Sequence, residues 1–378
     1  MSKIIPAMAV RTSQWCQTTL GEFVRLQRGH DLTDETRRFG HVPVMGAAGM
    51  NGYHDIARAK GPGVVIGRSG ASFGKAHYCP QDYWPHNTGL YVTDFQGNDP
   101  RFTYYFLKSL DFSGYNSGSA QPSLNRNFIY RIPVCVPDPI EQRAIAGVLG
   151  ALDDKIELNR RMNETLEALA HTLFQKMIQE GGKEVPFADS IEILGGGTPK
   201  TSVGDYWNGE IPWFSVVDAP SESDVFVIDT EKKITQAGIE NSSTQVLPVG
   251  TTIISARGTV GKVALVGVPM AMNQSCYGLR GKADDSGYYT YFQTRAVVGE
   301  LQQHAHGSVF DTITRDTLAG VDVPTPDPEI VTEFEKKVAP LMKRILNNLH
   351  ESQTLTALRD ALLPKLLSGA VRVKENKN

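Results

Sequence analysis

The sequence predicts an α+β protein of two tandem domains joined by two long helices, which form an antiparallel coiled coil with pseudo-two-fold symmetry. Three observations predict this fold. The second half of the chain repeats landmarks of the first at a constant separation, each repeat ends in a segment with helical periodicity, and short β-rich runs precede each helix. We place the domains at 1–140 and 184–328, and the helical regions at 141–183 and 329–378.

The composition is that of an ordinary soluble protein. The chain has 378 residues, of which 40% are hydrophobic, and this is enough for two cored domains. The stretch from Met1 to Val10 is too short for a signal sequence, and no run of about 18 apolar residues could span a bilayer. We therefore expect a cytoplasmic protein with no membrane partner. The 4 cysteines form no CxxC pair, so neither a zinc ribbon nor a disulfide scaffold is indicated.

The net charge of -3 is not typical of a nucleic-acid-binding protein. The acidic residues, however, leave gaps. Residues 56–81 and 241–283 contain arginines and lysines but no Asp or Glu. The sequence is therefore compatible with local basic surfaces on an acidic chain.

A repeat with a period of half the chain is the strongest internal signal. A shift of 189 residues aligns Arg126 with Arg315 and Pro137-Asp138-Pro139 with Pro326-Asp327-Pro328 without a gap. The same shift aligns Asn159 with Asn348 in the segments that follow. The beginning of each repeat has diverged and its end is regular, as expected for a module with a variable front and a shared structural tail.

The first front domain carries short β-rich runs at 63–67, 89–92 and 132–136. The tail that follows, 140–177, has apolar residues at spacings of three and four and no Gly after Gly150, which predicts one long helix.

The second front domain has β-rich runs at 252–254 and 320–323, and a helix is predicted from about Glu329 to Leu362. We expect Pro340 to kink this helix and Pro364 to lie near its end. Because neither helix is stable with its apolar stripe exposed, we expect the two to pack together, with Asn159 and Asn348 helping to fix the register. The alternative is that each helix packs on its own domain.

A glycine-rich loop in an acid-free stretch follows a predicted strand in each domain. Arg68 to Lys75 matches Arg257 to Lys262. Glycines allow close backbone approach to DNA, Arg offers a fork for guanine or phosphate, and Lys adds a point charge. The alternative is a tight hairpin with solvated cations. The candidate DNA-binding residues here are Arg68, Ser69, Ser72, Lys75, Arg257, Thr259 and Lys262.

A second pair of loops, 117–126 and 307–315, is rich in hydroxyl and amide side chains that suit phosphate and base-edge contacts. Their arginines adjoin predicted strands and are equally consistent with a structural role. The asparagines at 87 and 273 either present amides to adenine or cap a turn. The remaining candidates for DNA contact are Asn87, Ser119, Gln121, Asn125, Arg126, Lys200, Asn273, Gln274, Ser308 and Arg315.

Two enzyme-like patterns carry little weight. Gly195-Gly196-Gly197 is followed by Thr198-Pro199 and not by a helix, so a nucleotide-binding loop is not indicated. Pro137-Asp138 with Asp153-Asp154-Lys155 resembles a nuclease pattern, but the spacing differs between the repeats. We expect no catalytic, cofactor-binding or metal-binding residue in this chain.

Over essentially its whole length the chain resembles the specificity subunits of type I restriction enzymes. The resemblance rests on motifs in both tails and in the second domain: Glu141 to Ile145, Leu152 to Asn159, Leu358 to Gly369, Gly197 to Lys200 and Tyr206 to Trp213. The first domain differs, with Arg28-Gly29-His30 in place of Gly-Thr-Pro and Val44 in place of the Trp after Pro.

The resemblance implies two target-recognition domains that each read one half of an interrupted sequence in double-stranded DNA. It also implies that two methyltransferase subunits and two restriction/translocase subunits assemble around this chain. These partners would bind S-adenosylmethionine, ATP and Mg, and this chain would carry no cofactor. The alternative function is a duplicated protein-binding scaffold without DNA recognition.

Overall fold

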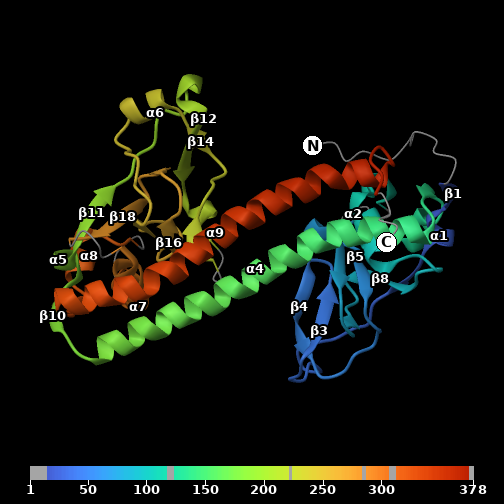
Figure 1. Cartoon of the computed structure of the whole chain (residues 1–378), viewed down its shortest axis with the longest axis horizontal. Coiled ribbons are helices and arrows are strands. Elements are labelled where there is room, and N and C mark those ends of the chain that lie inside the picture. The colour runs from blue at the N-terminus through green and yellow to red at the C-terminus, as the bar shows by residue number, and fades with distance from the viewer. Residues whose placement is uncertain (1–14, 117–122, 221–223, 283–286, 306–311, 374–378) are drawn as a thin grey trace, which may run out of the picture. The chain divides into compact units, whose positions relative to one another are not determined.

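The computed structural model describes residues 15–116, 123–220, 224–282, 287–305 and 312–373. Its contacts divide the chain into unit 1, Met1–Lys155 with Leu355–Asn378, and unit 2, Ile156–Thr354. Each unit thus combines one globular domain with a part of both long helices (Figure 1).

Unit 1 contains a four-stranded sheet in the order β2-β8-β5-β6, a three-stranded sheet in the order β4-β3-β7 and a separate β1-β9 pair. The strands are β1 (Cys16–Thr19), β2 (Arg25–Arg28), β3 (Val42–Gly46), β4 (Gly49–His54), β5 (Gly63–Gly67), β6 (Ala76–Cys79), β7 (Trp84–Pro85), β8 (Gly89–Asp94) and β9 (Pro133–Val136). The short helices are α1 (Leu20–Phe23), η1 (Gly70–Ser72), α2 (Pro100–Ser109), η2 (Ser113–Tyr115) and α3 (Arg126–Ile129).

Unit 2 contains a five-stranded sheet in the order β11-β18-β15-β16-β13, a three-stranded sheet in the order β14-β12-β17 and a β10-β19 pair. Its strands are β10 (Lys183–Pro186), β11 (Ile191–Gly195), β12 (Trp207–Phe214), β13 (Phe226–Val227), β14 (Lys233–Ile234), β15 (Thr252–Ser255), β16 (Val263–Val266), β17 (Ala271–Met272), β18 (Cys276–Gly281) and β19 (Asp322–Thr325). Its shorter helices are α5 (Phe187–Ser190), η3 (Gly204–Tyr206), η4 (Val216–Asp218), α6 (Gln236–Glu240), α7 (Gly287–Ala305) and α8 (Arg315–Ala319).

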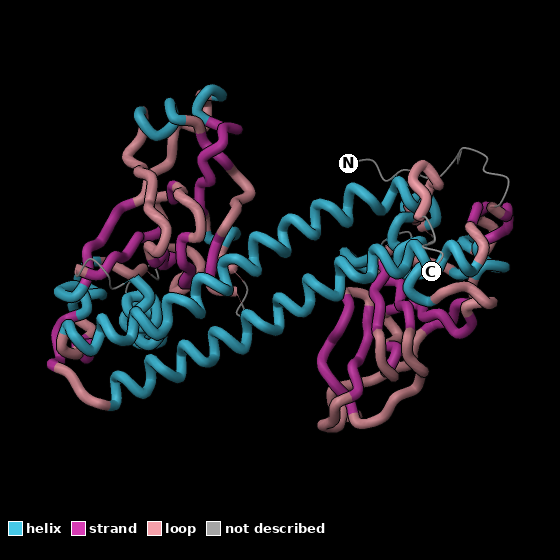
Figure 2. The backbone as a smooth tube through the Cα atoms, in the orientation of Figure 1, coloured by secondary structure: helices cyan, strands magenta, loops and turns pink. Residues whose placement is uncertain are grey.

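The two units share one strand order, which confirms the duplication. The run β2-β8-β5-β6 corresponds to β11-β18-β15-β16, β4-β3-β7 corresponds to β14-β12-β17, and β1-β9 corresponds to β10-β19. Unit 2 adds β13 at the edge of its larger sheet. Figure 2 shows the strands of each unit gathered in its globular part, beside the long helices.

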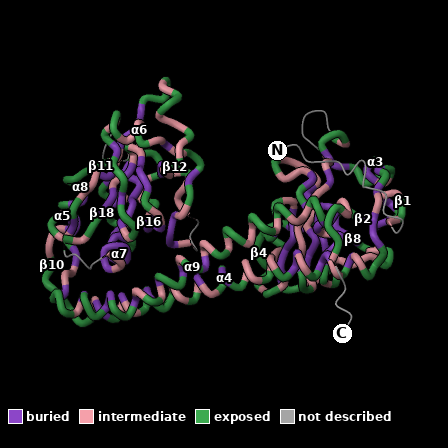
Figure 3. Tube along the Cα trace, turned by 45° about the horizontal axis from the view of Figure 1, so that its top comes forward, coloured by how far each residue is buried: buried purple, intermediate pink, exposed green. Residues whose placement is uncertain are grey.

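The central strands are the continuous apolar runs in the sequence. Every residue of β5 and of β15 is buried, as expected for strands covered on both faces. Figure 3 shows buried segments gathered inside the globular part of each unit. Helix α2 covers the sheet of unit 1 with Phe102 and Phe106, which pack on Phe23. In unit 2, Phe292 of α7 packs between Phe174 and Phe334 of the long helices.

The long helices α4 (Pro139–Gln179) and α9 (Pro328–Leu367) pack against each other, and their contacts run antiparallel. In unit 2 the rings of Phe174 and Phe334 are 6.0 Å apart, while Asn159 contacts the backbone of Asn348, farther along α9. In unit 1 Asp153 pairs with Arg359, while Ile145 and Leu149, earlier on α4, share a core cluster with Leu366 and Leu367, later on α9. The predicted antiparallel pairing is therefore confirmed inside each unit, and the pseudo-two-fold symmetry stays a prediction.

The two asparagines predicted at the helix seam are both buried, with 0% and 1% exposure for Asn159 and Asn348. The Asn348 amide donates to Asn163 Oδ1 at 2.8 Å, and the Asn159 amide donates to Glu351 at 2.8 Å. Helix α9 is longer than the sequence predicts, because it continues through Pro340 and past Pro364 to Leu367.

Candidate nucleic-acid interface

A glycine-rich hairpin joins β5 to β6 in unit 1. The Gly67 amide donates to the Lys75 carbonyl at 2.8 Å, and the Gly74 amide donates to the Gly67 carbonyl at 2.8 Å. Gly70 and Gly74 have φ angles of 70° and 74°, a conformation that favours glycine. The segment is a tight hairpin, so a role in binding rests on its side chains.

The corresponding hairpin in unit 2 joins β15 to β16 with one residue fewer. The Ser255 amide donates to the Lys262 carbonyl at 2.9 Å, and the Gly261 amide donates to the Ser255 carbonyl at 2.9 Å. The Ser255 hydroxyl closes the shorter loop by donating to the Thr259 carbonyl at 2.5 Å. Gly258 has a φ of 77° and takes the place of Gly70.

The backbone of Arg68 is fixed on both sides. Its amide donates to the Thr88 carbonyl at 2.9 Å, and its carbonyl accepts from the Leu124 amide at 2.8 Å. The next residue, Ser69, forms an isolated antiparallel bridge with Ser123. The hairpin is thereby tied to the second predicted loop segment of the same domain.

In unit 2 the same bonds are made by Ala256. Its amide donates to the Ser275 carbonyl at 2.8 Å, and its carbonyl accepts from the Ile313 amide at 2.9 Å. The next residue, Arg257, forms the isolated bridge, here with Thr312. Both units therefore hold the two loop segments together in the same way.

These bonds correct the correspondence predicted from the sequence. The backbone counterpart of Arg68 is Ala256, and that of Arg257 is Ser69. The unit 2 hairpin is one residue shorter, so aligning the two arginines places the missing residue at the wrong point. The two guanidinium groups project from consecutive positions of one shared backbone frame.

Four cationic side chains of the hairpins are accessible. Arg68 is partly exposed, and Lys75, Arg257 and Lys262 are exposed. Within the described part of the chain, no hydrogen bond or ion pair engages these four side-chain cations. An arginine with such access can bind guanine or phosphate without first breaking an internal contact.

A groove of about 670 Å³ lies beside the hairpin of unit 1. It brings the predicted residues Arg68, Asn125 and Arg126 together with residues that the prediction missed, at the end of β2 and just after it. Arg28, His30 and Asp31 belong to this second group. Arg28 and His30 belong to the Arg28-Gly29-His30 landmark and Asp31 follows it, so the departure of this landmark from the motif of the second domain was the available signal.

The surroundings of the His30 ring in this groove disfavour its charged form. Burial, followed by the positive charge of Arg58, lowers its pKa from the usual 6.5. The Tyr91 hydroxyl lies 3.5 Å from His30 Nε2. The groove thus places arginine charges beside an imidazole whose pKa is lowered.

Arg126 and Arg315 make the same structural contact in the two units. Arg126 donates to the Leu26 carbonyl at 3.0 Å, and Arg315 donates to the Ile193 carbonyl at 3.3 Å. Their matched bonds to corresponding strands favour the structural interpretation of this pair. Asn125 likewise caps α3, because its side chain accepts from the Asn127 amide.

The two predicted asparagines are not backbone counterparts. The Asn273 amide donates to the Phe214 carbonyl of β12 at 2.9 Å. In unit 1 the equivalent bond to β3 is made by His86, whose amide donates to the Met45 carbonyl at 2.8 Å. Asn273 therefore takes the place of His86. The Asn273 side chain accepts from the Ser275 amide at 3.0 Å, so it caps a turn, as one of the two interpretations predicted.

Asn87 corresponds to Gln274 in this frame. The Asn87 amide donates to Asp31, and the Gln274 carbonyl oxygen accepts from Thr198. A polar side-chain pair is therefore present beside the hairpin in both units.

The other predicted residues are less informative. Ser72 belongs to η1, Thr259 is exposed, and Lys200 is exposed while its carbonyl accepts from Trp207 at 3.3 Å. Ser119, Gln121 and Ser308 lie outside the described residues.

A tryptophan makes an equivalent backbone contact from different strands in the two units. In unit 1, Trp84 of β7 lies opposite Val44 of β3 and donates to the His30 carbonyl at 3.4 Å. In unit 2, Trp213 lies on β12, the counterpart of β3, and donates to the Gly197 carbonyl at 3.0 Å. The Trp expected at Val44 is therefore replaced by one from the neighbouring strand, which conserves the contact.

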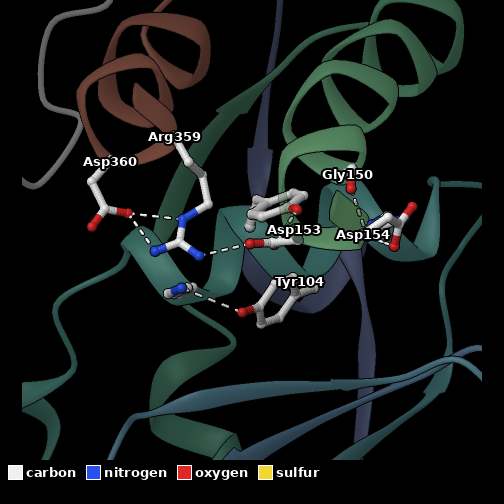
Figure 4. A network of polar contacts seen from close by, with 9 residues as sticks. Tyr104, Gly150, Asp153, Asp154, Arg359 and Asp360 are labelled. Atoms are coloured by element: carbon white, nitrogen blue, oxygen red, sulfur yellow. Dashed lines mark hydrogen bonds and ion pairs between the residues drawn. The ribbon is translucent and has the colours of Figure 1, made fainter. Parts of the chain in front are cut away.

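A polar network joins α2, α4 and α9 in unit 1 (Figure 4). Arg359 donates to Asp153 at 2.6 Å, and the Tyr105 hydroxyl donates to the same carboxylate at 2.5 Å. Burial, followed by this hydrogen bond, raises the pKa of Tyr105 above its usual 10.0. Arg101 donates to Asp154 at 2.7 Å, and this bond lowers the pKa of that carboxyl. Asp153 and Asp154 of the nuclease-like pattern are therefore engaged in contacts between helices.

In the described ranges, no group of three or more His, Cys, Asp or Glu residues is placed to hold a metal ion. A search of the same ranges finds no helix long and apolar enough to cross a membrane.

The chain contains two duplicated α+β units, and each unit has one hairpin with accessible cationic side chains. These features define a binding subunit with two similar binding domains. The family model for the type I restriction modification DNA specificity domain matches residues 12–168 and 180–359. The chain therefore belongs to the type I restriction modification DNA specificity domain family.

Curated relatives include the type I restriction enzyme HindI specificity subunit of Haemophilus influenzae, which is 22% identical over 357 residues, covering 72% of this chain and 77% of the relative. The MjaIX specificity subunit of Methanocaldococcus jannaschii is 31% identical over 143 residues, covering 37% of this chain and 33% of the relative. These relatives support the specificity-subunit interpretation over the protein-binding scaffold.

The crystal structure of a type I restriction-modification system S subunit from M. genitalium has a similar fold, with a TM-score of 0.68 at 16% identity. The match covers 96% of this chain and 99% of that structure.

Proposed function

We propose that this chain is the non-catalytic DNA-specificity subunit of a cytoplasmic type I restriction–modification complex. Each unit reads one half of a bipartite site in double-stranded DNA. Two methyltransferase subunits and two restriction/translocase subunits bind the chain and supply adenine methylation, translocation and cleavage. S-adenosylmethionine, ATP and Mg are bound by those partners.

The observation that carries this proposal is the shared frame around the two hairpins. Equivalent backbone bonds hold each hairpin against a second loop segment, while the side chains at equivalent positions differ. A constant frame with variable side chains is what two readers of different sequences require. A frame used only for stability has no need for accessible arginines at different positions.

The chemistry of the hairpins suits DNA. Arg presents a planar fork of donors that matches guanine O6 and N7 or a phosphate, and the glycines allow the backbone to approach closely. The acid-free stretches around both hairpins keep carboxylates away from a polyanion in sequence. Local charge thus supports binding although the net charge is -3.

The long helices provide the surface for the partner subunits and the spacing between half-sites. Exposed apolar side chains lie on them, with exposures of 57% for Ile140, 53% for Leu158 and 47% for Leu169 and Leu358. Apolar side chains exposed singly are normal on a protein surface, so the docking of partner subunits on these helices is proposed from the similarity to specificity subunits. The 41 residues of α4 extend about 62 Å at 1.5 Å per residue, which exceeds one turn of DNA.

Selection from a random duplex library tests this proposal. The full chain is combined with its cognate methyltransferase subunit, bound duplexes are sequenced, and affinity is measured at several salt concentrations. We expect two short blocks of defined bases separated by a fixed number of undefined ones, with affinity that falls steeply as salt rises. A single continuous motif would contradict two independent readers, and the absence of sequence preference would favour the scaffold.

A further inference from the structure

Beside each hairpin, two side chains from different segments are hydrogen-bonded to each other. In unit 1 the Asn87 side-chain amide donates to the Asp31 carboxylate. In unit 2 the Thr198 hydroxyl donates to the Gln274 side-chain carbonyl. Asp31 and Thr198 were not among the residues predicted from the sequence.

The backbone places these pairs at equivalent positions. The His30 amide donates to the Pro85 carbonyl at 2.7 Å, and the Gly197 amide donates to the Met272 carbonyl at 3.0 Å, so Asp31 and Thr198 each follow the same bond.

In both units the backbone just before Asp31 or Thr198 also lies very close to the backbone of a second segment. A Cβ added at Gly29 would lie 2.2 Å from the His86 carbonyl oxygen, and one added at Gly196 would lie 2.0 Å from that of Asn273. Only glycine fits there, and the two segments are therefore held together in both units.

Each pair adjoins an arginine-bearing hairpin. Asn87 precedes Thr88, whose carbonyl accepts the Arg68 amide, and Gln274 precedes Ser275, whose carbonyl accepts the Arg257 amide at 3.2 Å.

The pairs are accessible to a ligand. The Asp31 side chain is 76% exposed and Gln274 is exposed. The unit 2 pair joins two neutral groups, and the unit 1 pair joins an amide to a carboxylate. At exposed sites water competes for the groups of both pairs, so each hydrogen bond contributes little to stability. The recurrence of these pairs therefore needs a reason other than folding.

An amide that is held in one orientation can read adenine. Asn and Gln bind adenine with two bonds, by donating to N7 and accepting from the N6 amino group. The Asp31 carboxylate takes one amide hydrogen of Asn87, which leaves the second hydrogen and the Oδ1 atom for a base. The Thr198 hydroxyl fixes which end of the Gln274 amide is oxygen, and it leaves both amide hydrogens and the second lone pair of Oε1 for a base.

We propose that Asn87 and Gln274 each read one adenine in their own half-site, and that Asp31 and Thr198 are positioning residues that fix the orientation of the amides. This inference rests on the proposed function and deepens it. It assigns to each unit one base-reading residue whose partner differs chemically, a carboxylate in unit 1 and a hydroxyl in unit 2.

The test uses the duplex selection described above with four alanine variants, at Asn87, Asp31, Gln274 and Thr198. Asn87→Ala is expected to lower the preference for adenine at one position of one half-site by about 5- to 150-fold and to leave the other half unchanged. Gln274→Ala is expected to do the same in the other half. Asp31→Ala and Thr198→Ala should lower the preference at the same positions as their partners.

Two controls separate positioning from a structural role. Asp31→Asn keeps an acceptor oxygen and should retain the adenine preference. Asp34→Ala removes an exposed carboxylate from the same loop and should change nothing. The wild type should bind a duplex with 7-deazaadenine at the affected position more weakly than it binds the unmodified duplex. Asn87→Ala should bind the two duplexes equally well.

The outcomes are distinguishable from failure of the proposed function. A wild type that selects no two-part motif would overturn both proposals. If the wild type selects a two-part motif, this inference is overturned when the variants leave every position unchanged, weaken a half-site uniformly, or alter preference for a base other than adenine.

Discussion

At the scale of single residues, the two hairpins differ in which position of the shared backbone frame carries the arginine. Arg68 lies at the position of Ala256, and Arg257 lies at the position of Ser69. Because consecutive positions of an extended backbone point to opposite sides, the two guanidinium groups are presented differently to a ligand. The sequence predicted both hairpins and their cations. It did not predict this offset, because matching the two arginines by residue type ignores that the hairpin of unit 2 is one residue shorter.

Arg257→Ala is expected to weaken recognition in one half-site only. If Arg257 reads a base, the change costs about 1–3 kcal/mol on duplexes that carry the preferred base and little on others, whereas loss of a phosphate contact weakens all duplexes alike. Binding isotherms on duplexes that vary in one half at a time measure this. Lys232→Ala, at an exposed lysine of the same unit, is the control. Unchanged affinity and methylation pattern in Arg257→Ala would make the hairpin structural only.

At the scale of elements, the helix pair has different chemistry in its two halves although the sequence repeat is regular. The shift of 189 residues places Asp153 on Met342 and Ala170 on Arg359. Met342 and Ala170 are both buried among apolar residues of unit 2, whereas Asp153 and Arg359 form an ion pair in unit 1. Periodicity predicted both helices, but it did not show that one end of the pair is polar.

Breaking this ion pair from one side should be costly. Arg359→Ala leaves the Asp153 carboxylate with fewer hydrogen bonds in a site where its side chain is 23% exposed, and we expect the free energy of unfolding to fall by about 1–3 kcal/mol. Urea denaturation measures this. Lys337→Ala, in an exposed pair with Glu333, should change the value by less than about 1 kcal/mol.

Replacing the whole cluster should restore stability. The triple variant Asp153→Met, Arg359→Ala and Tyr105→Phe installs the residues of unit 2 and removes the hydroxyl that would lose its acceptor. We expect its free energy of unfolding to be within about 1 kcal/mol of the wild type, since apolar replacements of buried pairs are often neutral. A triple variant as unstable as Arg359→Ala would contradict this explanation.

The buried asparagines of the helix seam should specify register at a cost in stability. Asn348→Leu removes the amide that donates to Asn163 and leaves the buried Asn163 oxygen without this hydrogen bond. We expect the free energy of unfolding to fall by about 1–3 kcal/mol. Changing Asn159, Asn163 and Asn348 together to Leu should raise the midpoint of thermal unfolding while allowing other helix registers. Cysteine crosslinking between neighbouring helix positions detects such registers, and a single register with lower stability would be the opposite result.

The long buried strands were predicted from the sequence, and the shortest strands were not. Buried runs such as 63–67 and 252–254 are strands in the structure, because continuous apolar residues suit the centre of a sheet. Short strands such as β7 and β17, of two residues each, carry no periodic pattern. Consequently the Trp84 contact that supports the groove could not be predicted from the Val44 position alone.

At the scale of the whole molecule, the chain combines two readers with one helix pair. The shared strand order and the match of the family model to 12–168 and 180–359 establish the duplication. The central claim is that each unit reads its own half-site and that the helices set the number of base pairs between the halves. An insertion in a helix then changes the spacing and not the bases.

Methylome sequencing of a strain that carries four extra helix-forming residues between Gln175 and Gln179 tests this claim most directly. Four residues add about 6 Å of helix, and DNA rises about 3.4 Å per base pair. We expect the undefined spacer to lengthen by about one or two base pairs while both half-site sequences stay the same. An active complex with an unaltered spacer would show that the helices do not set the spacing, and altered half-site bases would show that the two units are not independent readers.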